Sequence, residues 1–245
     1  MWRITLDRTD ARNAVSREML ARLTSGLAEA AADEGCRVVL LTGEGEHFCA
    51  GADFGEIEGD PAAFERDFAA ALDAIASHPV PVVAAIRGAA LGAGCQIAVA
   101  CDLAVSAADA RIGIPSSRLG IVIGFENIQR LVLAIGPKRA SELLFTGTPV
   151  DGVTAAAWGL VNEAVDASEV AARAEAVAAE IASGAPLSVR GSKRGIAAVL
   201  AHLSVGAEPG LAEVDAAVAE AFASEDLREG VRAFRERRPP KFEGR

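Results

Sequence analysis

Apolar positions dominate the stretch 82–100, VVAAIRGAALGAGCQIAVA, which begins after the prolines at 79 and 81. An apolar run, a glycine-rich turn from Gly88 to Gly94 and a second apolar run follow one another. This order predicts a buried strand, a tight turn and a buried helix. Glycine lets a backbone approach another group closely, and a helix that begins here has N–H groups without partners inside the helix.

The pattern along the rest of the chain predicts strands and helices that alternate through the first two thirds. Strands are expected over 1–6, 37–42, 102–106, 111–115 and 160–165, and helices over 17–32, 61–77, the second half of 118–136, 137–145 and 151–159. Ser16 and Asp60 are the expected N-caps of the first two helices. A loop is expected over 43–57, and helices with breaks near 184–186 and 208–210 from residue 168 onwards. We therefore predict an α/β core over residues 1–190 and a C-terminal helical region over 191–245.

Composition limits the function classes that need to be considered. The 245 residues are 51% hydrophobic and 4% aromatic, which is typical of a globular protein with closely packed helices. The net charge of −10 argues against nucleic acid as a partner. No apolar run is long enough to span a bilayer. The first ten residues lack a basic-then-apolar leader, so we expect a cytoplasmic protein.

Cysteine and histidine give no sign of a metal site. The four cysteines form no CxxC pair, and the three histidines are scattered along the chain. The C-terminal stretch is basic in an otherwise acidic protein, with Arg or Lys at 232, 235, 237, 238 and 241. It is either a solvated helix end or a local phosphate site.

Three chemistries are compatible with a glycine-rich turn between a strand and a helix. A dinucleotide site needs GxGxxG, but Ile97 stands at the third glycine position. A phosphate-binding P-loop needs Gly-Lys-Ser/Thr, which is absent here. The third chemistry is an oxyanion site, in which helix N–H groups stabilise negative charge on a carbonyl oxygen. Such a site needs a second N–H donor, and the small-residue loop FCAGAD at 48–53 offers one.

The stretches FCAGAD and GAALGAGCQIAVACD together resemble the enoyl-CoA hydratase/isomerase family, the crotonase superfamily. The resemblance covers nearly the whole chain. LDRTDARNAVS is similar to the family's N-terminal segment, TGTPVDGVTAAAWGLVNEAV to its TG…A…GLV segment, and EGVRAFRERRPPKF to its C-terminal helix.

This resemblance implies a fold and a ligand. The fold is a crotonase-like spiral of ββα units with a C-terminal helical trimerisation region, in a homotrimer or a dimer of trimers. The ligand is an acyl-CoA or enoyl-CoA thioester, with no further cofactor and no metal. The thioester oxygen is held by the backbone N–H groups of Ala52 and Ala93. The family contacts coenzyme A at positions that correspond to Ala11, Arg12, Ala50, Ala52, Phe234 and Arg237. Asp53 is expected to cap a helix or fix its loop.

The chain departs from the family where the acid–base groups usually stand. The family has two glutamates, and the corresponding residues are Gln96 and Ser116. Glutamine does not titrate, and a serine hydroxyl is a poor acid and a poor base unless a base lies beside it. Because each general acid or base is typically worth ~100- to 10,000-fold in rate, we expect slow hydration at best.

Two functions remain open on this basis. In the first, the protein binds or carries an acyl-CoA thioester in fatty acid metabolism without efficient hydration. In the second, it is an enoyl-CoA isomerase or a weak hydratase that uses another base, and Glu126 is the nearest candidate. The favoured explanation of Glu126 is nevertheless a first-turn residue that stabilises a helix N-terminus. The apolar segment Leu119–Phe125 is either core packing or an acyl-chain pocket. A Clp-type serine protease is disfavoured because no nucleophile–histidine pair lies at the turn.

Overall fold

A parallel sheet of five strands forms the centre of the computed structural model, which describes residues 1–203 and 208–244 and the side chains of 1–200 and 214–244. The strands are β1 (Trp2–Leu6), β2 (Val39–Gly43), β3 (Val82–Ile86), β5 (Leu103–Ala107) and β7 (Glu163–Val165), and they are hydrogen-bonded in that order. Every residue of β3 is buried. This burial fits its position in the middle of a parallel sheet covered on both faces.

A second, two-stranded sheet carries the glycine-rich turn. It pairs β4 (Ala89–Leu91) with β6 (Arg111–Gly113) in parallel. The sequence predicted β6 as a short extended piece and placed β4 inside a turn. β4 is held as a strand by its pairing with β6 on one side and Cys49 on the other. The local sequence pattern did not reveal it because both partners are distant in sequence.

The helices follow the predicted boundaries closely. They are α1 (Arg17–Ala32), α2 (Phe54–Gly59), α3 (Pro61–Ala76), α4 (Ala93–Ala100), α5 (Phe125–Thr146), α6 (Gly152–Trp158), α7 (Val170–Ser183), α8 (Pro186–Leu203), α9 (Glu208–Ala223) and α10 (Glu225–Glu236). Two short 3₁₀ helices lie at Thr9–Ala11 and Ser116–Arg118. The predicted N-caps are confirmed, since Ser16 accepts a hydrogen bond from the Met19 N–H and Asp60 one from the Ala63 N–H.

The expected break near Gly136 is also confirmed. Gly136 has a φ of 76° inside α5, and Pro137 follows it. Two features of the α-helices were not predicted: the short helix α2, and the break at Ser224 that separates α9 from α10. The predicted break near 208–210 coincides with the start of α9 at Glu208, and the preceding residues 204–207 lie outside the described residues.

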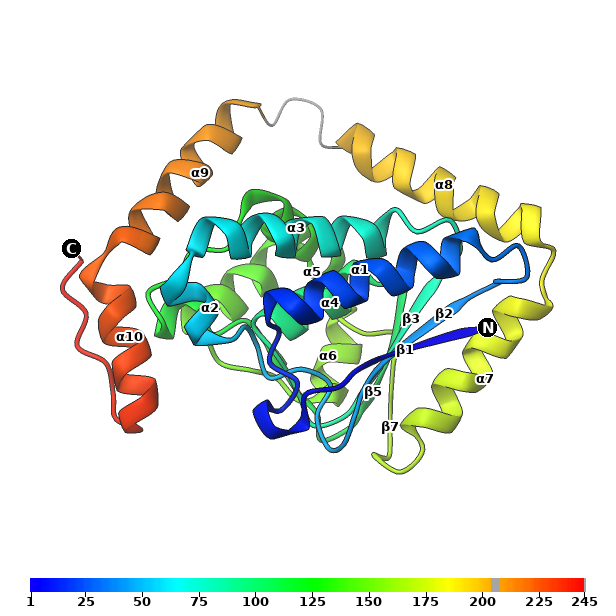
Figure 1. Cartoon of the computed structure of the whole chain (residues 1–245), viewed down its shortest axis with the longest axis horizontal. Helices are drawn as coiled ribbons and strands as arrows, with labels where there is room; N and C mark the ends of the chain where they lie inside the picture. Colours follow the sequence, from blue (N-terminus) through cyan, green and yellow to red (C-terminus); the bar gives the residue numbers. More distant parts are fainter. Residues whose placement is uncertain (204–207, 245) are drawn as a thin grey trace.

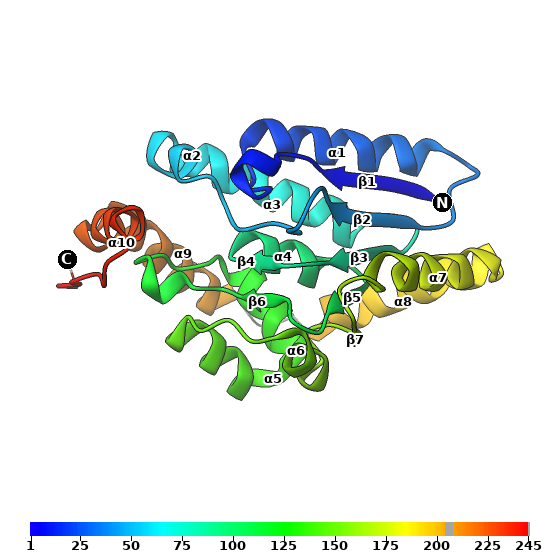
Figure 2. The same cartoon turned by 90° about the horizontal axis from the view of Figure 1, so that it is seen from below.

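The helices surround the sheet and extend beyond it at two opposite ends (Figures 1 and 2). α9 and α10 lie at one end with the C-terminus, whereas α7 and α8 lie at the other with the N-terminus. α8 is tied to the sheet by Lys193, whose ammonium group lies 2.7 Å from an Asp102 carboxylate oxygen. The domain boundary expected near residue 190 falls within α8.

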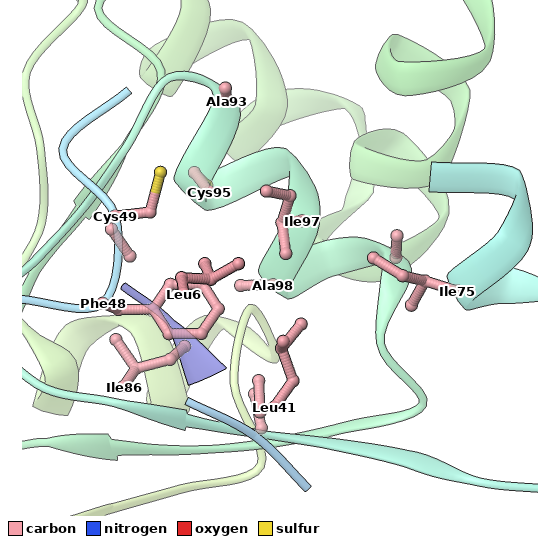
Figure 3. Packing of buried hydrophobic residues seen from close by; sticks show 14 of the residues in the cluster. Leu6, Leu41, Phe48, Cys49, Ile75, Ile86, Ala93, Cys95, Ile97 and Ala98 are labelled. Atoms are coloured by element: carbon pink, nitrogen blue, oxygen red, sulfur yellow. The ribbon is translucent and has the colours of Figure 1, made fainter. Parts of the chain in front are cut away.

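The hydrophobic core lies directly behind the glycine-rich turn. Figure 3 shows Phe48 and Cys49 beside α4, whose first turn carries Ala93 and Cys95. Ile97 on the next turn is fully buried. Because α4 is buried nearly all round, its N-terminus is held in a fixed place. In the described part of the chain, no helix is both long and apolar enough to cross a membrane.

Candidate functional site

Two glycine-containing loops meet in front of α4. The Cys49 N–H donates to the Ala89 carbonyl at 2.9 Å, and the Leu91 N–H donates to the Cys49 carbonyl at 3.0 Å. Farther along, a Cβ placed on Gly92 would lie 3.9 Å from the Gly51 Cα. Gly51 and Gly92 have φ values of 134° and 53°, which side chains disfavour. These two glycines therefore bring the residues that follow them close together.

The residues that follow are Ala52 and Ala93. Neither N–H donates to a protein acceptor within the described residues. Ala93 is the first residue of α4, where helix N–H groups have no internal partner. Around Ala52, the Gly51 carbonyl and the Asp53 N–H both bond to Val15, at 2.9 Å each. Since neighbouring backbone groups alternate in direction along an extended chain, the Ala52 N–H points away from Val15. Two available donors on adjoining loops are what an oxyanion hole requires, and we call these two loops the oxyanion-hole loops.

A close contact fixes the distance between the two loops. A Cβ on Gly94 would lie 2.3 Å from the Cys49 carbonyl oxygen and 2.8 Å from the Cys49 Cβ. Only glycine fits at such a distance from backbone, so the first turn of α4 packs directly on the loop that carries Ala52. The spacing of the two N–H donors thus depends on packing between backbones.

The N-terminal loop is attached to the same place by Asn13, which sequence reasoning missed. The Asn13 side-chain amide donates to the carbonyls of Glu44 at 2.8 Å and His47 at 2.7 Å. Asn13 is completely buried and has a φ of 57°, a conformation that asparagine tolerates better than most residues. One signal in the sequence could have indicated this role: Asn13 of LDRTDARNAVS is an asparagine, the residue type that often occupies a positive φ in a turn.

Three of the residues expected to contact coenzyme A come together through this attachment. The Ala50 N–H donates to the Arg12 carbonyl at 3.0 Å, and Ala11 precedes Arg12 in the same short 3₁₀ turn. Ala50 in turn lies two residues before Ala52. The structure therefore brings Ala11, Arg12 and Ala50 to the edge of the oxyanion-hole loops.

Asp53 orders the loop that carries Ala52, as expected. Its side chain accepts the Gly55 N–H at 2.8 Å and caps α2. It also pairs with the Arg8 guanidinium at 2.6 Å. Partial burial acts to raise the pKa of Asp53, but the Arg8 and Gly55 hydrogen bonds outweigh it and hold this pKa below its ordinary value. Asp53 thus stays ionised and has a positioning role.

Gln96 and Ser116, which we call the wall residues, lie on two elements next to Ala93: Gln96 on α4 itself, and Ser116 after β6, whose Gly113 carbonyl accepts the Gly92 N–H at 2.8 Å. Gln96 lies three residues after Ala93, on the same face of α4 one turn further on. Ser116 follows β6 at the start of a 3₁₀ turn. Each is only 9% exposed. Among the described residues neither side chain has a hydrogen-bond partner, so both amide and hydroxyl remain available to a ligand.

Glu126 stands apart from these wall residues. It is exposed in the first turn of α5, the place where a carboxylate stabilises a helix N-terminus. Its neighbour Asn127, rather than Glu126, lines the crevice that contains Gln96. The role of Glu126 as a base stays a prediction.

The segment Leu119–Phe125 packs partly beneath α10. A Cβ on Gly230 would lie 2.5 Å from the Leu119 carbonyl oxygen, and one on Gly120 would lie 2.7 Å from the Asp226 carbonyl carbon. Of this segment, Ile123 is buried. These contacts favour core packing over an acyl-chain pocket for its first residues.

Helix α10 also contacts α2. The Phe234 ring centroid lies 5.1 Å from that of Phe54, and the Arg235 guanidinium lies 2.8 Å from a Glu58 carboxylate oxygen. Phe234 nevertheless remains 63% exposed. α10 is thereby held beside the loop that leads from Ala52 into α2, which places Phe234 near the oxyanion-hole region.

Much of the basic charge near the C-terminus is neutralised within the chain. Glu229, only 8% exposed, accepts hydrogen bonds from Arg238, Arg232 and the Lys241 N–H, and these hold the pKa of Glu229 far below its ordinary value. Arg237 differs, because it has no carboxylate partner within the described residues. A phosphate group could therefore bind Arg237 without displacing an internal partner.

Known proteins resemble this chain along its full length. The family described as "Enoyl-CoA hydratase/isomerase" matches residues 1–245. A "Probable enoyl-CoA hydratase" of Bacillus subtilis is 38% identical over 239 residues, which cover 95% of this chain and 91% of that protein. The "2,3-dehydroadipyl-CoA hydratase" of Escherichia coli is 35% identical over 250 residues, covering 99% of this chain and 94% of that protein.

Solved structures agree with this relationship. The crystal structure of an enoyl-CoA hydratase/isomerase from Pseudoalteromonas atlantica superposes with a TM-score of 0.86 at 30% identity, covering 98% of this chain and 95% of that one. The parallel sheet, the glycine-rich turn before α4 and the C-terminal helices are thus part of a known fold. The chain belongs to the enoyl-CoA hydratase/isomerase family.

Proposed function

We propose that this protein binds acyl-CoA or enoyl-CoA thioesters, with the thioester oxygen on the N–H groups of Ala52 and Ala93, and that it hydrates enoyl thioesters slowly. The observation that carries the proposal is the pairing of two available backbone donors with the wall residues Gln96 and Ser116, neither of which titrates. The donors suit a carbonyl oxygen that gains negative charge, and each such donor is worth roughly 100- to 1,000-fold in catalysis.

Hydration requires more than a polarised carbonyl. One proton must be delivered to the carbon next to the thioester, and another must be removed from the attacking water. Gln96 and Ser116 can orient a water by hydrogen bonds, but neither holds or accepts a proton at neutral pH. The site therefore supports binding and polarisation of the thioester better than it supports addition of water.

A second candidate is an active hydratase or isomerase. The names of the relatives favour it, because both curated relatives described above are called hydratases. An isomerase would need one carboxylate as its base, and Glu126 is the candidate for that group. Turnover of 2-enoyl-CoA and 3-enoyl-CoA separates these functions from binding alone.

The remaining ligand contacts and the assembly are part of the same proposal. Coenzyme A is the ligand, without another cofactor, and its contacts are Ala11, Arg12, Ala50, Phe234 and Arg237. The protein assembles as a homotrimer or a dimer of trimers. Helix α8 supports this assembly, since it exposes the apolar side chains Leu187, Ile196, Val199 and Leu200.

The decisive variant is Ala93→Pro. Proline lacks the N–H donor, yet it is well accepted at the first position of a helix, where Ala93 stands. We expect Ala93→Pro to weaken hexanoyl-CoA and crotonyl-CoA binding by about two- to tenfold in calorimetry, since a hydrogen bond to a neutral carbonyl oxygen is worth roughly 0.5–1.5 kcal/mol. The matched control Ala93→Gly keeps the donor and should bind normally.

Two results would overturn the proposal. Failure of the wild-type protein to bind any CoA thioester would remove its basis. Rapid hydration of crotonyl-CoA by the wild-type protein, at rates that Gln96→Ala leaves unchanged, would show that the neutral wall residues do not limit the reaction.

A further inference from the structure

The aromatic ring of Phe234, near the end of α10, lies at the surface although another ring packs against it. Its partner is Phe54, the first residue of α2, with ring centroids 5.1 Å apart and ring planes inclined at 59°. Phe234 nonetheless remains 63% exposed. A phenylalanine that served only to attach α10 would be expected to bury most of its ring, because burial is the source of the hydrophobic free energy. Much of this ring therefore stays open to a partner outside the chain.

Phe54 is the fixed member of this pair. Its side chain is half-buried and packs against the hydrophobic core, and its backbone is ordered by the Asp53 carboxylate, which caps α2. Figure 1 shows α10 beside α2, and the Arg235–Glu58 ion pair is a second contact between the two helices. Because Phe234 rests on a ring that is itself held in place, Phe54 limits the directions in which Phe234 can point.

Arg237 ends α10 in a backbone conformation that a side chain disfavours. It has a φ of 54° at the helix C-terminus, where glycine is the commonest residue in this conformation. Non-glycine residues held in the left-handed region cluster at functional sites. The Arg237 side chain is exposed and has no carboxylate partner within the described residues. An open aromatic ring and an available guanidinium, three positions apart, match the base and a phosphate of a nucleotide.

We propose that Phe54 is a positioning residue for the nucleotide end of coenzyme A. It holds the Phe234 ring in an orientation in which the adenine base stacks on that ring and a phosphate binds Arg237. The inference rests on the proposed function, which has Phe234 and Arg237 among the ligand contacts but gives Phe54 no role. Since Phe54 follows Ala52 by two residues, one short segment carries both an oxyanion-hole donor and the support of the nucleotide-binding ring. The competing explanation is that the two rings only attach α10 to α2.

Two thioesters with the same acyl group test the inference. Hexanoyl-CoA carries the nucleotide, whereas hexanoyl-pantetheine lacks it. Calorimetry gives the dissociation constant of each, and the ratio of the two constants isolates the contribution of the nucleotide. The wild-type protein should favour hexanoyl-CoA by about tenfold or more, as is typical of a base stacked on an aromatic ring.

Phe54→Leu keeps an apolar side chain but removes the ring that supports Phe234. It should reduce this ratio about two- to tenfold, the usual contribution of an aromatic pair, and leave the affinity for hexanoyl-pantetheine within about twofold of the wild type. Phe54→Tyr keeps the ring and should keep the wild-type ratio. Glu58→Gln is the matched control, because it removes the second contact between α2 and α10 and leaves both rings in place. It should not lower the ratio.

A double variant separates positioning from two independent contacts. Phe54→Leu and Phe234→Leu each remove the same aromatic pair, so the double variant should have the same ratio as Phe234→Leu alone. Additive losses would overturn the positioning role. An equal loss of affinity for both thioesters in Phe54→Leu would also overturn it, as would a ratio in Glu58→Gln as low as that in Phe54→Leu.

The wild-type measurements are decisive even where a variant fails to fold. Equal binding of hexanoyl-CoA and hexanoyl-pantetheine overturns the inference and leaves the proposed binding of the thioester at Ala52 and Ala93 standing. Absence of binding by both thioesters overturns the proposed function itself.

Discussion

The oxyanion-hole loops and the wall residues meet on α4, where Gln96 lies one turn after Ala93, yet the two are built on different principles. The loops place backbone N–H groups by contacts between backbones, such as that of Gly94 with the Cys49 carbonyl. The wall residues Gln96 and Ser116 act through their side chains. A substitution there changes the chemistry of the side chain and leaves the backbone N–H donors present. A site of this kind can lose its proton-transfer groups while it keeps its ability to bind a carbonyl.

The largest effect is expected when carboxylates are introduced at the two wall residues. The double variant Gln96→Glu/Ser116→Glu should raise hydration of crotonyl-CoA by up to ~10,000-fold, because each restored acid or base is worth about 100-fold or more. The loss of enoyl absorbance measures the rate. The single variant Gln96→Glu should give an intermediate gain, and Glu126→Gln should leave the gain unchanged. No gain in a folded double variant would contradict the role assigned to the wall residues.

A somewhat smaller effect should follow from disturbing the loops without removing any donor. Gly94→Ala places a methyl group 2.3 Å from the Cys49 carbonyl oxygen, so the first turn of α4 must move. We expect affinity for acyl-CoA to fall about 10- to 100-fold, since both N–H contacts to the oxygen depend on that spacing. Gly191→Ala on α8 is the control, because nothing lies within 4 Å of its Cβ position. Equal affinity of the two variants would argue against a packed oxyanion hole.

A third test uses pH, to which the two regions should respond differently. The pKa of Asp53 is lowered from its ordinary value of 3.8, so its pairing with Arg8 stabilises the fold fully above that value. This stabilisation is lost as the pH falls below 3.8 towards the lower pKa of the folded state. The difference in unfolding free energy between the wild type and Asp53→Asn should stay constant from pH 7 to about 5 and shrink below about 4.

Denaturant titrations at pH 7, 5 and 3.5 measure this difference. The exposed Asp7, substituted by asparagine, serves as the control and should change stability little at any pH. Gln96→Ala should leave the pH dependence of acyl-CoA affinity between pH 5 and 8 unchanged, because neither wall residue titrates there. A difference for Asp53→Asn that grows on acidification would refute the assigned direction of the pKa.

The smallest expected effect lies at the exposed end of the ligand. Arg237→Ala should weaken CoA binding only about two- to fivefold, as is usual for an exposed charge, and 0.5 M salt should remove most of the difference. Arg228→Ala on the same helix is the control, because Arg228 pairs with Glu225 and has no expected ligand contact. Calorimetry at low and high salt measures both. An identical loss of CoA affinity in the two variants would show that Arg237 acts only by general electrostatic attraction and makes no specific contact.

The amino-acid sequence by itself determined the elements whose signals are local. The strand before Gly88, the helix after Gly92, the caps Ser16 and Asp60, and the break at Gly136 all depend on neighbouring residues, and the structure confirms them. The sequence also indicated the family, which the comparisons confirm. The identity of Gln96 and Ser116 could be read directly from it.

The tertiary structure decided what depends on contacts between distant segments. β4 exists because Cys49 and β6 flank it, and Asn13 acts through carbonyls more than thirty positions away. Arg232 and Arg238 are paired with Glu229, and Asn127 reaches the crevice beside Gln96 because α5 packs on α4. Local patterns fix backbone conformation over a few residues, but the partner of a backbone or side-chain group is set by packing between elements.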